Sequence, residues 1–174
     1  LAKIKDILII VNKGQLDQYK KLIPNGKNLG INITYKEQDK PRGLPDAFIL
    51  GERFIGKENV AMILGDNFFY GQNLTSTLIK SAKIKIGAKI LLHKVQNPEL
   101  FGVAVVNSKK KITQLKEKPK KYMSDNAITG LYFFDNNVVK YSKSLKISKR
   151  GELEITDLLQ IYKKKKKLFA DFIG

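Results

Sequence analysis

The sequence predicts an α/β fold built on a mixed, mostly parallel sheet, and three observations lead to that class. Residues 7–11 and 60–64 are continuous apolar runs, which are typical of strands covered on both faces. Between them, residues 15–23 have the apolar spacing of a helix, and residues 31–37 alternate as a half-buried strand does. The order strand, helix, strand favours parallel pairing. We expect a single domain over residues 1–174, because no linker is long enough to divide the chain.

The later elements continue this alternation. Residues 44–55 predict one helix with Pro45 in its first turn, where a missing N–H costs nothing. Asn73 is expected to cap the next helix, and Asn136 or Asn137 the one after it. Further helices are expected near residues 74–82, 138–141 and 158–162, and further strands near 88–95, 103–106, 112–117, 127–134 and 168–173.

Composition limits the class of protein. A hydrophobic content of 43% is ordinary for a globular chain. The chain has no cysteine, which excludes disulfides and thiolate metal sites and suits a cytoplasmic protein. No apolar run has the length of a membrane span, so we expect no membrane partner. Leu1 is not an initiator methionine, which is compatible with a chain that starts partway through a longer protein. The single histidine, His93, is expected to be structural, because it cannot form a zinc site unaided.

The formal charge of +17 raises a second class of function, a basic nucleic-acid-binding domain. Only Arg42, Arg53 and Arg150 are arginines, and every other basic residue is lysine. Arginine is the residue preferred for bidentate recognition of phosphates and bases. We therefore interpret the charge, including the lysine run at 163–167, as a solvated surface and expect no nucleic-acid partner.

Polar residues follow several of the predicted strands and form the candidate site. Asp66 and Asn67 come directly after the apolar run 60–64, and a carboxylate there can hold Mg²⁺ beside a phosphate. A local turn or cap explains the same two residues equally simply. The loop from Gln38 to Gly43 could bind a planar base edge or could be a surface turn.

A second group of candidates lies later in the chain. Glu117 and Lys118 end a strand before Pro119, where the lysine could hold a phosphate and the carboxylate could accept sugar hydroxyls. Two exposed charges at a strand end are the alternative. Gly130 interrupts an apolar strand, which indicates a bulge or the close approach of a ligand.

Five segments together resemble one family. They are Leu64–Asn67, Phe69–Gly71, Glu117–Pro119, Ile128–Tyr132 and Arg150–Asp157. In this order they resemble the glucose-1-phosphate thymidylyltransferases, which are sugar nucleotidyltransferases. The resemblance implies a Rossmann-like nucleotidyltransferase core that is incomplete at both ends here, so residues 1–174 would be part of one nucleotidyltransferase domain.

The family resemblance also implies a reaction. A sugar 1-phosphate oxygen attacks the α-phosphorus of dTTP, giving dTDP-glucose and pyrophosphate, with Mg²⁺ as the cofactor. The resemblance implies that the partners are dTTP and glucose 1-phosphate and that the protein acts in dTDP-glucose and polysaccharide biosynthesis. It also implies that the full-length protein is a homotetramer. The alternatives are a UTP–glucose-1-phosphate uridylyltransferase and a catalytically inactive sensor of a sugar nucleotide.

Roles for individual residues follow from the same resemblance. Asp66 and Lys118 would be catalytic, Asp66 as the Mg²⁺ ligand beside the nucleotide and Lys118 at the sugar phosphate. The thymine contacts would be Gln38 and Gly43, and the sugar-phosphate pocket would be formed by Asn67, Gly102, Glu117, Lys118, Ile128, Thr129, Gly130 and Tyr132. Phe101 stands where the family often has tyrosine.

Two family features are absent from these residues. The family begins with a glycine-rich loop that carries an arginine, and a second Mg²⁺ carboxylate follows a tryptophan; this sequence has neither that loop nor any tryptophan. Backbone N–H groups around a triphosphate and a second metal ligand stabilise charge in such transfers. We therefore expect residues 1–174 alone to be inactive or nearly so.

Overall fold

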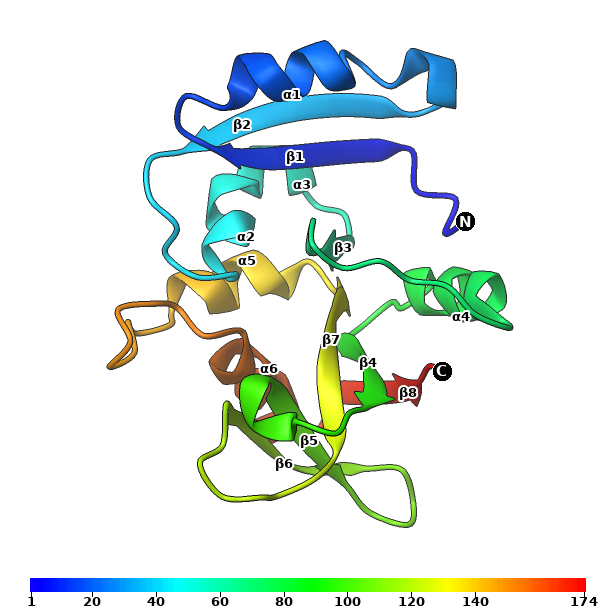
Figure 1. The fold of residues 1–174 in the computed structure, drawn as a ribbon, viewed down its shortest axis with the longest axis vertical. Coiled ribbons are helices and arrows are strands. Elements are labelled where there is room, and N and C mark those ends of the chain that lie inside the picture. The colour runs from blue at the N-terminus through cyan, green and yellow to red at the C-terminus, as the bar shows by residue number, and fades with distance from the viewer.

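The computed structural model describes residues 1–174 and folds them into two sheets with helices on their faces (Figure 1). The smaller sheet pairs β1 (Asp6–Asn12) with β2 (Asn32–Gln38) in parallel. α1 (Leu16–Leu22) and the 3₁₀ turn η1 (Lys27–Leu29) connect the two strands. The parallel pairing expected from the first strand, helix and strand is therefore confirmed.

The larger sheet has six strands in the order β6-β5-β7-β4-β8, and β3 also pairs with β7. Its strands are β3 (Val60–Ile63), β4 (Ala88–Lys94), β5 (Gly102–Val106), β6 (Ile112–Glu117), β7 (Asn126–Phe134) and β8 (Leu168–Phe172). Only β4 and β8 pair in parallel; the other pairs are antiparallel. The mixed α/β class is confirmed, but the expectation of a mostly parallel sheet is wrong. β5, β6 and β7 follow one another without an intervening helix, and such short connections produce antiparallel neighbours.

β3 differs from the expectation most clearly. Its apolar run predicts a strand covered on both faces in the centre of a parallel sheet. In the structure β3 pairs with β7 alone, in antiparallel register, and Ile63 is 60% exposed. The run of apolar residues indicates a strand correctly, but it carries no information on how many neighbours that strand has.

Helices cover both faces of the larger sheet (Figure 1). α2 (Asp46–Leu50), α5 (Asn137–Lys143) and α6 (Ile155–Lys164) supply side chains to the main core, with β4 and β7. α4 (Leu74–Ala82) packs on the other face with Leu91, Leu131 and Phe133. α6 buries Leu158 and Leu159 completely, and each such side chain contributes about 1.5–3 kcal/mol by its removal from water.

The helix expected over residues 44–55 is two short helices. α2 ends at Leu50 and α3 (Glu52–Ile55) follows Gly51 directly. A Cβ at Gly51 would lie 2.9 Å from the Ala47 carbonyl oxygen and 3.2 Å from a methyl group of Leu8 on β1. The break therefore occurs where a residue without a side chain lets the smaller sheet approach the helix. None of the helices is long and apolar enough to cross a membrane.

A buried carboxylate joins α5, α6 and the start of β4. Asp135 is 4% exposed and accepts hydrogen bonds from the Tyr162 hydroxyl at 2.8 Å and the Gly87 N–H at 2.7 Å. It also accepts the Asn137 N–H at 3.1 Å and so caps α5. Burial, and then this carboxylate, raise the pKa of the Tyr162 hydroxyl. The cap expected from Asn136 or Asn137 is therefore supplied by the residue before them.

The two expected asparagine caps have other geometries. The Asn136 side-chain amide donates to the main-chain carbonyls of residues 56 and 58, after α3. Asn73 precedes α4 with a left-handed φ of 59° and makes no side-chain cap bond. Asparagine tolerates this backbone conformation better than most residues, which is the role it has here.

Candidate active site

Gly102 is the point at which three later segments of the chain meet. It opens β5 and lies opposite Glu117 of β6. A Cβ at this position would lie 3.1 Å from Glu117 Oε2, 3.2 Å from Thr156 Cγ2 and 3.6 Å from Ile128 Cδ1. A side chain at residue 102 would therefore occupy the space beside a carboxylate, a threonine and the face of β7. The absence of a side chain at Gly102 therefore lets the Glu117 carboxylate and the methyl groups of Thr156 and Ile128 pack close to the β5 main chain.

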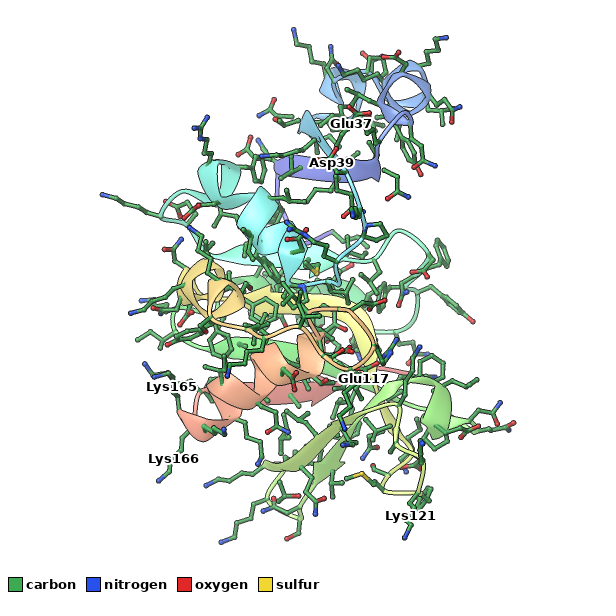
Figure 2. All side chains as sticks on the ribbon, turned by 90° about the vertical axis from the view of Figure 1, so that its left-hand side faces the viewer. Glu37, Asp39, Glu117, Lys121, Lys165 and Lys166 are labelled. Atoms are coloured by element: carbon green, nitrogen blue, oxygen red, sulfur yellow. The ribbon has the colours of Figure 1, made fainter.

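Glu117 is the central charged group of this site. Its side chain is 22% exposed, and it lies near the middle of the view in Figure 2, whereas Lys121, Lys165 and Lys166 lie at the periphery. Burial is the main cause that raises the pKa of Glu117, and the negative charge of Glu154 adds to it. The positive charges of Arg150 and Lys118 and a hydrogen bond with Thr156 oppose that rise. A carboxylate that is poorly solvated in this way gains when ligand hydroxyl groups donate to it.

Arg150 lies between two carboxylates. Its Nη1 is 3.7 Å from Glu117 Oε1 and 3.6 Å from Glu154 Oε2. The Ser148 hydroxyl donates to Glu154 at 2.7 Å, and Glu154 is 9% exposed. Individual roles for Arg150, Glu154 and Thr156 were not predicted from the sequence, although all three belong to the segment Arg150–Asp157. The dense alternation of charges before an apolar helix was the available signal.

Lys118 follows Glu117 with an unusual backbone. Its φ is +38°, in the left-handed region of the backbone, and a residue with a side chain adopts this region at a cost of about 1–3 kcal/mol. The Lys118 N–H donates to the Phe101 carbonyl at 3.0 Å, and Pro119 is buried. The Lys118 side chain is exposed and forms no ion pair, so its ammonium group is free to meet an anion. The conformation is held by the surrounding contacts and turns the chain sharply at the end of β6.

Asp66 and Asn67 are tied to β7 at Gly130. The Asn67 side-chain oxygen accepts the Gly130 N–H at 3.0 Å, and its amide donates to Asp66 Oδ1 at 2.8 Å. The Leu64 N–H donates to the Gly130 carbonyl at 2.9 Å. The register between β4 and β7 shifts between Ile90 and Leu92, beside Gly130. The bulge, one of the two alternatives predicted at this glycine, is therefore confirmed, and the group that lies close to Gly130 is the Asn67 side chain.

Asp66 is exposed beside the strand end, where it can reach a ligand. No group of three or more histidine, aspartate or glutamate side chains gathers anywhere in the structure. Mg²⁺ is commonly held by one or two carboxylates together with substrate phosphates and water, so the single carboxylate of Asp66 fits that ion.

β7 connects the two parts of the site. The Gly130 N–H binds the Asn67 side chain, next to Asp66. Ile128 lies two residues away on the same strand and borders Gly102 and Glu117. Residues two apart on a strand are roughly 7 Å apart. Tyr132 is 3% exposed, and burial followed by the charge of Glu117 raises the pKa of its hydroxyl. Ile128 and Tyr132 thus both lie near Glu117.

Thr129 lies apart from these predicted sugar-site residues. Its hydroxyl donates to the Leu91 carbonyl on β4 at 3.0 Å, so the side chain is engaged with the neighbouring strand. The irregular register at this point explains the contact, because it brings the threonine against the β4 main chain. The proton of the Thr129 hydroxyl is therefore engaged with β4.

The two predicted thymine contacts have distinct environments. Gln38 ends β2, and its side-chain amide donates to Asn12 Oδ1 at 3.0 Å. Gly43 has a φ of +97°, and a Cβ there would run into the main chain of Leu153. Gly43 therefore lies against the segment that carries Arg150 and Glu154. His93, which was expected to be structural, contacts the Ile173 carbonyl through Nδ1 at 2.9 Å.

The fold and this site define a nucleotide-transferring class of protein. Residues 1–174 match the family described as Nucleotidyl transferase, and the chain belongs to that family.

Two relatives with assigned names resemble this chain over its whole length. The chain is 45% identical over 174 residues to a glucose-1-phosphate thymidylyltransferase of Neisseria meningitidis, and 39% identical over 174 residues to one of Mycolicibacterium smegmatis. Both comparisons cover 100% of this chain and 60% of the relative, so the chain spans less than two thirds of those proteins.

Solved structures agree on the fold. A candidate glucose-1-phosphate thymidylyltransferase from Bacillus anthracis, in complex with a sucrose, superposes with a TM-score of 0.90 at 39% identity, over 99% of this chain and 70% of that one. A UDP-glucose pyrophosphorylase in complex with UDP-glucose superposes with a TM-score of 0.80 at 21% identity, over 97% and 73%. The second likeness concerns the fold alone.

Proposed function

We propose that this chain supplies the sugar-phosphate site and part of the nucleotide site of an enzyme that transfers a thymidylyl group from dTTP to α-D-glucose 1-phosphate. The observation that carries the proposal is the convergence of Glu117, Thr156 and Ile128 on Gly102. The site combines a poorly solvated carboxylate with a neighbouring free ammonium group, which are the partners that hydroxyl groups and a phosphate need. The thymidylyltransferases of Neisseria and Mycolicibacterium support the choice of nucleotide and sugar.

The reaction forms one bond and breaks one. An oxygen of the sugar phosphate attacks the α-phosphorus of dTTP, and the bond from that phosphorus to the bridging oxygen breaks as pyrophosphate leaves. Such an in-line displacement needs position and neutralised charge more than a protein nucleophile. Mg²⁺, when bound at Asp66, would supply neutralisation of the phosphate charge.

Each side chain has a task in this scheme. Glu117 accepts hydrogen bonds from glucose hydroxyls, and Gly102, which has no side chain, allows this carboxylate to lie close to the β5 main chain. Lys118 holds the sugar phosphate as a point charge. Gln38 and Gly43 receive the thymine, and the Gly130–Asn67 contact fixes the loop that presents Asp66. Tyr132 and Ile128 form the apolar wall, and Thr129 contributes main chain only.

The test is turnover of the chain in its complete reading frame with dTTP, glucose 1-phosphate and Mg²⁺. Asp66→Ala and Lys118→Ala should each reduce pyrophosphate release by about 100-fold or more, because position and charge supply most of the catalysis. Lys121→Ala and Asp17→Asn are matched controls on exposed residues and should retain full turnover. Full turnover in both site variants would refute the site.

Competition assays separate this function from its alternatives. A preference for UTP over dTTP would select the uridylyl reaction; thymine and uracil differ by one methyl group, worth about 1 kcal/mol of discrimination. Binding of dTDP-glucose without turnover would indicate a sensor. Steep salt-dependent binding of arbitrary DNA would favour the nucleic-acid alternative. The homotetramer implied by the resemblance is tested by the mass of the full-length protein in solution, and a cytoplasmic site of action by fractionation.

A further inference from the structure

The loop before α2 and the segment before α6 are joined through their main chains. The Leu153 N–H donates to the Arg42 carbonyl at 2.8 Å. The next residue, Gly43, lies so close that its Cβ would be 2.8 Å from the Leu153 nitrogen. Two segments more than a hundred residues apart in the chain therefore share one hydrogen bond and one tight contact. The positions of Arg42 and Leu153 depend on each other.

The side chain of Arg42 is held by a buried carboxylate. Its Nη2 donates to Asp46 Oδ1 at 2.9 Å and its Nε to Asp46 Oδ2 at 3.2 Å, a bidentate pair. The Asp46 side chain is 2% exposed, whereas the Arg42 side chain is 58% exposed. A buried carboxylate without its partner is strongly disfavoured, so Asp46 at the start of α2 keeps the guanidinium group in place.

The contacts continue from Leu153 to the site. Glu154 follows it directly and is bound by the Ser148 hydroxyl and by Arg150. Arg150 in turn reaches Glu117 at 3.7 Å. A continuous series of contacts therefore runs from the first helix after the loop to the carboxylate at the centre of the candidate site.

We propose that Arg42 is a positioning residue. Its ion pair with Asp46 fixes the Arg42 main-chain carbonyl, which holds the Leu153 N–H. The position of Leu153 in turn determines where Glu154 and Arg150 lie beside Glu117. One consequence rests on the proposed function. If the loop from Gln38 to Gly43 receives the nucleotide base, the junction couples nucleotide binding to sugar-phosphate binding. Such coupling is reciprocal, because each ligand changes the affinity of the other by the same factor.

Amide hydrogen exchange of the free 174-residue chain tests the junction without any ligand. Arg42→Gln should accelerate exchange at the Leu153 amide by about tenfold or more, since the acceptor is no longer held. Arg42→Lys, which keeps one ion pair, should give a smaller acceleration, and it serves as the test if Arg42→Gln does not fold. Arg53→Gln is the matched control on an exposed arginine without an ion pair and should change nothing.

The Leu64 amide, bonded to Gly130 on the other side of the site, is the internal reference. It should exchange at the same rate in all variants. Unchanged exchange at Leu153, or equal acceleration at Leu64 and Leu153, overturns the positioning role.

Calorimetric titration tests the coupling. In the unsubstituted chain, saturating dTTP should raise the affinity for glucose 1-phosphate by about fivefold or more, and in Arg42→Gln this factor should fall close to one. Independent binding of the two ligands by the unsubstituted chain overturns the coupling. Binding of neither ligand overturns the proposed function and the coupling together, and Leu153 exchange then decides the positioning role alone.

Discussion

Gly130→Ala perturbs the contact that ties the Asp66 loop to β7. The new Cβ would lie 2.6 Å from Asn67 Oδ1, 2.7 Å from Asn67 Cγ and 2.8 Å from Leu64 Cδ1. The Asn67 amide must retreat by roughly 0.8 Å to reach an ordinary contact of 3.4 Å. That movement strains both hydrogen bonds of Asn67, to the Gly130 N–H and to Asp66.

The expected size follows from these contacts. Forcing a methyl group into a filled space costs about 1–3 kcal/mol, and a strained hydrogen bond adds about 1 kcal/mol. The free energy of unfolding should therefore fall by about 2–4 kcal/mol. Displacing a catalytic group by about 1 Å costs about 100-fold in rate, so kcat/KM should fall by roughly that factor as Asp66 moves with its neighbour.

Urea denaturation measures the first quantity, and pyrophosphate release by the chain in its complete reading frame measures the second. Gly65→Ala is the matched control, because a Cβ there meets nothing within 4 Å although the residue adjoins Asp66. Equal stability of the two variants would refute the tight contact at Gly130. A loss of stability with full turnover would show that the contact does not position Asp66.

Three further outcomes are expected. Because the pKa of Glu117 is raised, the folded chain binds the proton of the Glu117 carboxyl more tightly than the unfolded chain does. The protonated carboxyl therefore contributes to stability below the ordinary pKa of 4.5, and this contribution is lost as the pH rises through the raised pKa. Glu117→Gln should thus stabilise the free chain at pH 7 while weakening glucose 1-phosphate binding by about 10- to 100-fold. Tyr162→Phe should lower the free energy of unfolding by about 1–2 kcal/mol, because Asp135 loses one of its buried donors. Gly43→Ala should weaken dTTP binding by about tenfold or more, since the methyl group collides with Leu153.

Denaturation at pH 4 and pH 7 and calorimetric titration check these outcomes. Glu117→Gln that destabilises the chain at pH 7 would contradict the burial argument. Tyr162→Phe without effect would show that water replaces the hydroxyl. For Gly43→Ala the control is Gly14→Ala, which has a similar positive φ of 84° but nothing within 4 Å, so equal effects would exclude the contact with Leu153 as the cause.

Local sequence pattern predicted most strands and helices, although it merged α2 and α3 into one helix, and it did not predict which strands pair. The apolar runs predicted β1, β3 and β7 within one or two residues, because alternation and apolar content are properties of each segment alone. The pairing of β7 with β3, β4 and β5 depends on residues far apart in the chain. Nothing in the run at residues 60–64 distinguishes a strand with one neighbour from a strand with two.

The candidate site residues likewise fall into those that could be predicted from local sequence and those that only the fold reveals. Glu117, Lys118, Asp66 and Gly130 could be selected because each stands at a strand end or interrupts a strand. Arg150 and Glu154 became part of the site only through the fold, which brings α6 and the segment before it against β5 and β6. The engagement of Thr129 with β4 likewise depends on a register shift that no local spacing reveals.

The position of β7 in the chain has a consequence for how the protein folds during synthesis. Within residues 1–174, β3 pairs with β7, roughly 70 residues downstream, and β4 and β5 also pair with that strand. At about 5–20 residues per second, the ribosome leaves the β3 edge unpaired for roughly 4–14 s. β7 cannot cover the apolar side chains of β3 during that interval, so the yield of soluble chain should depend on translation speed and on chaperones that shield nascent strands.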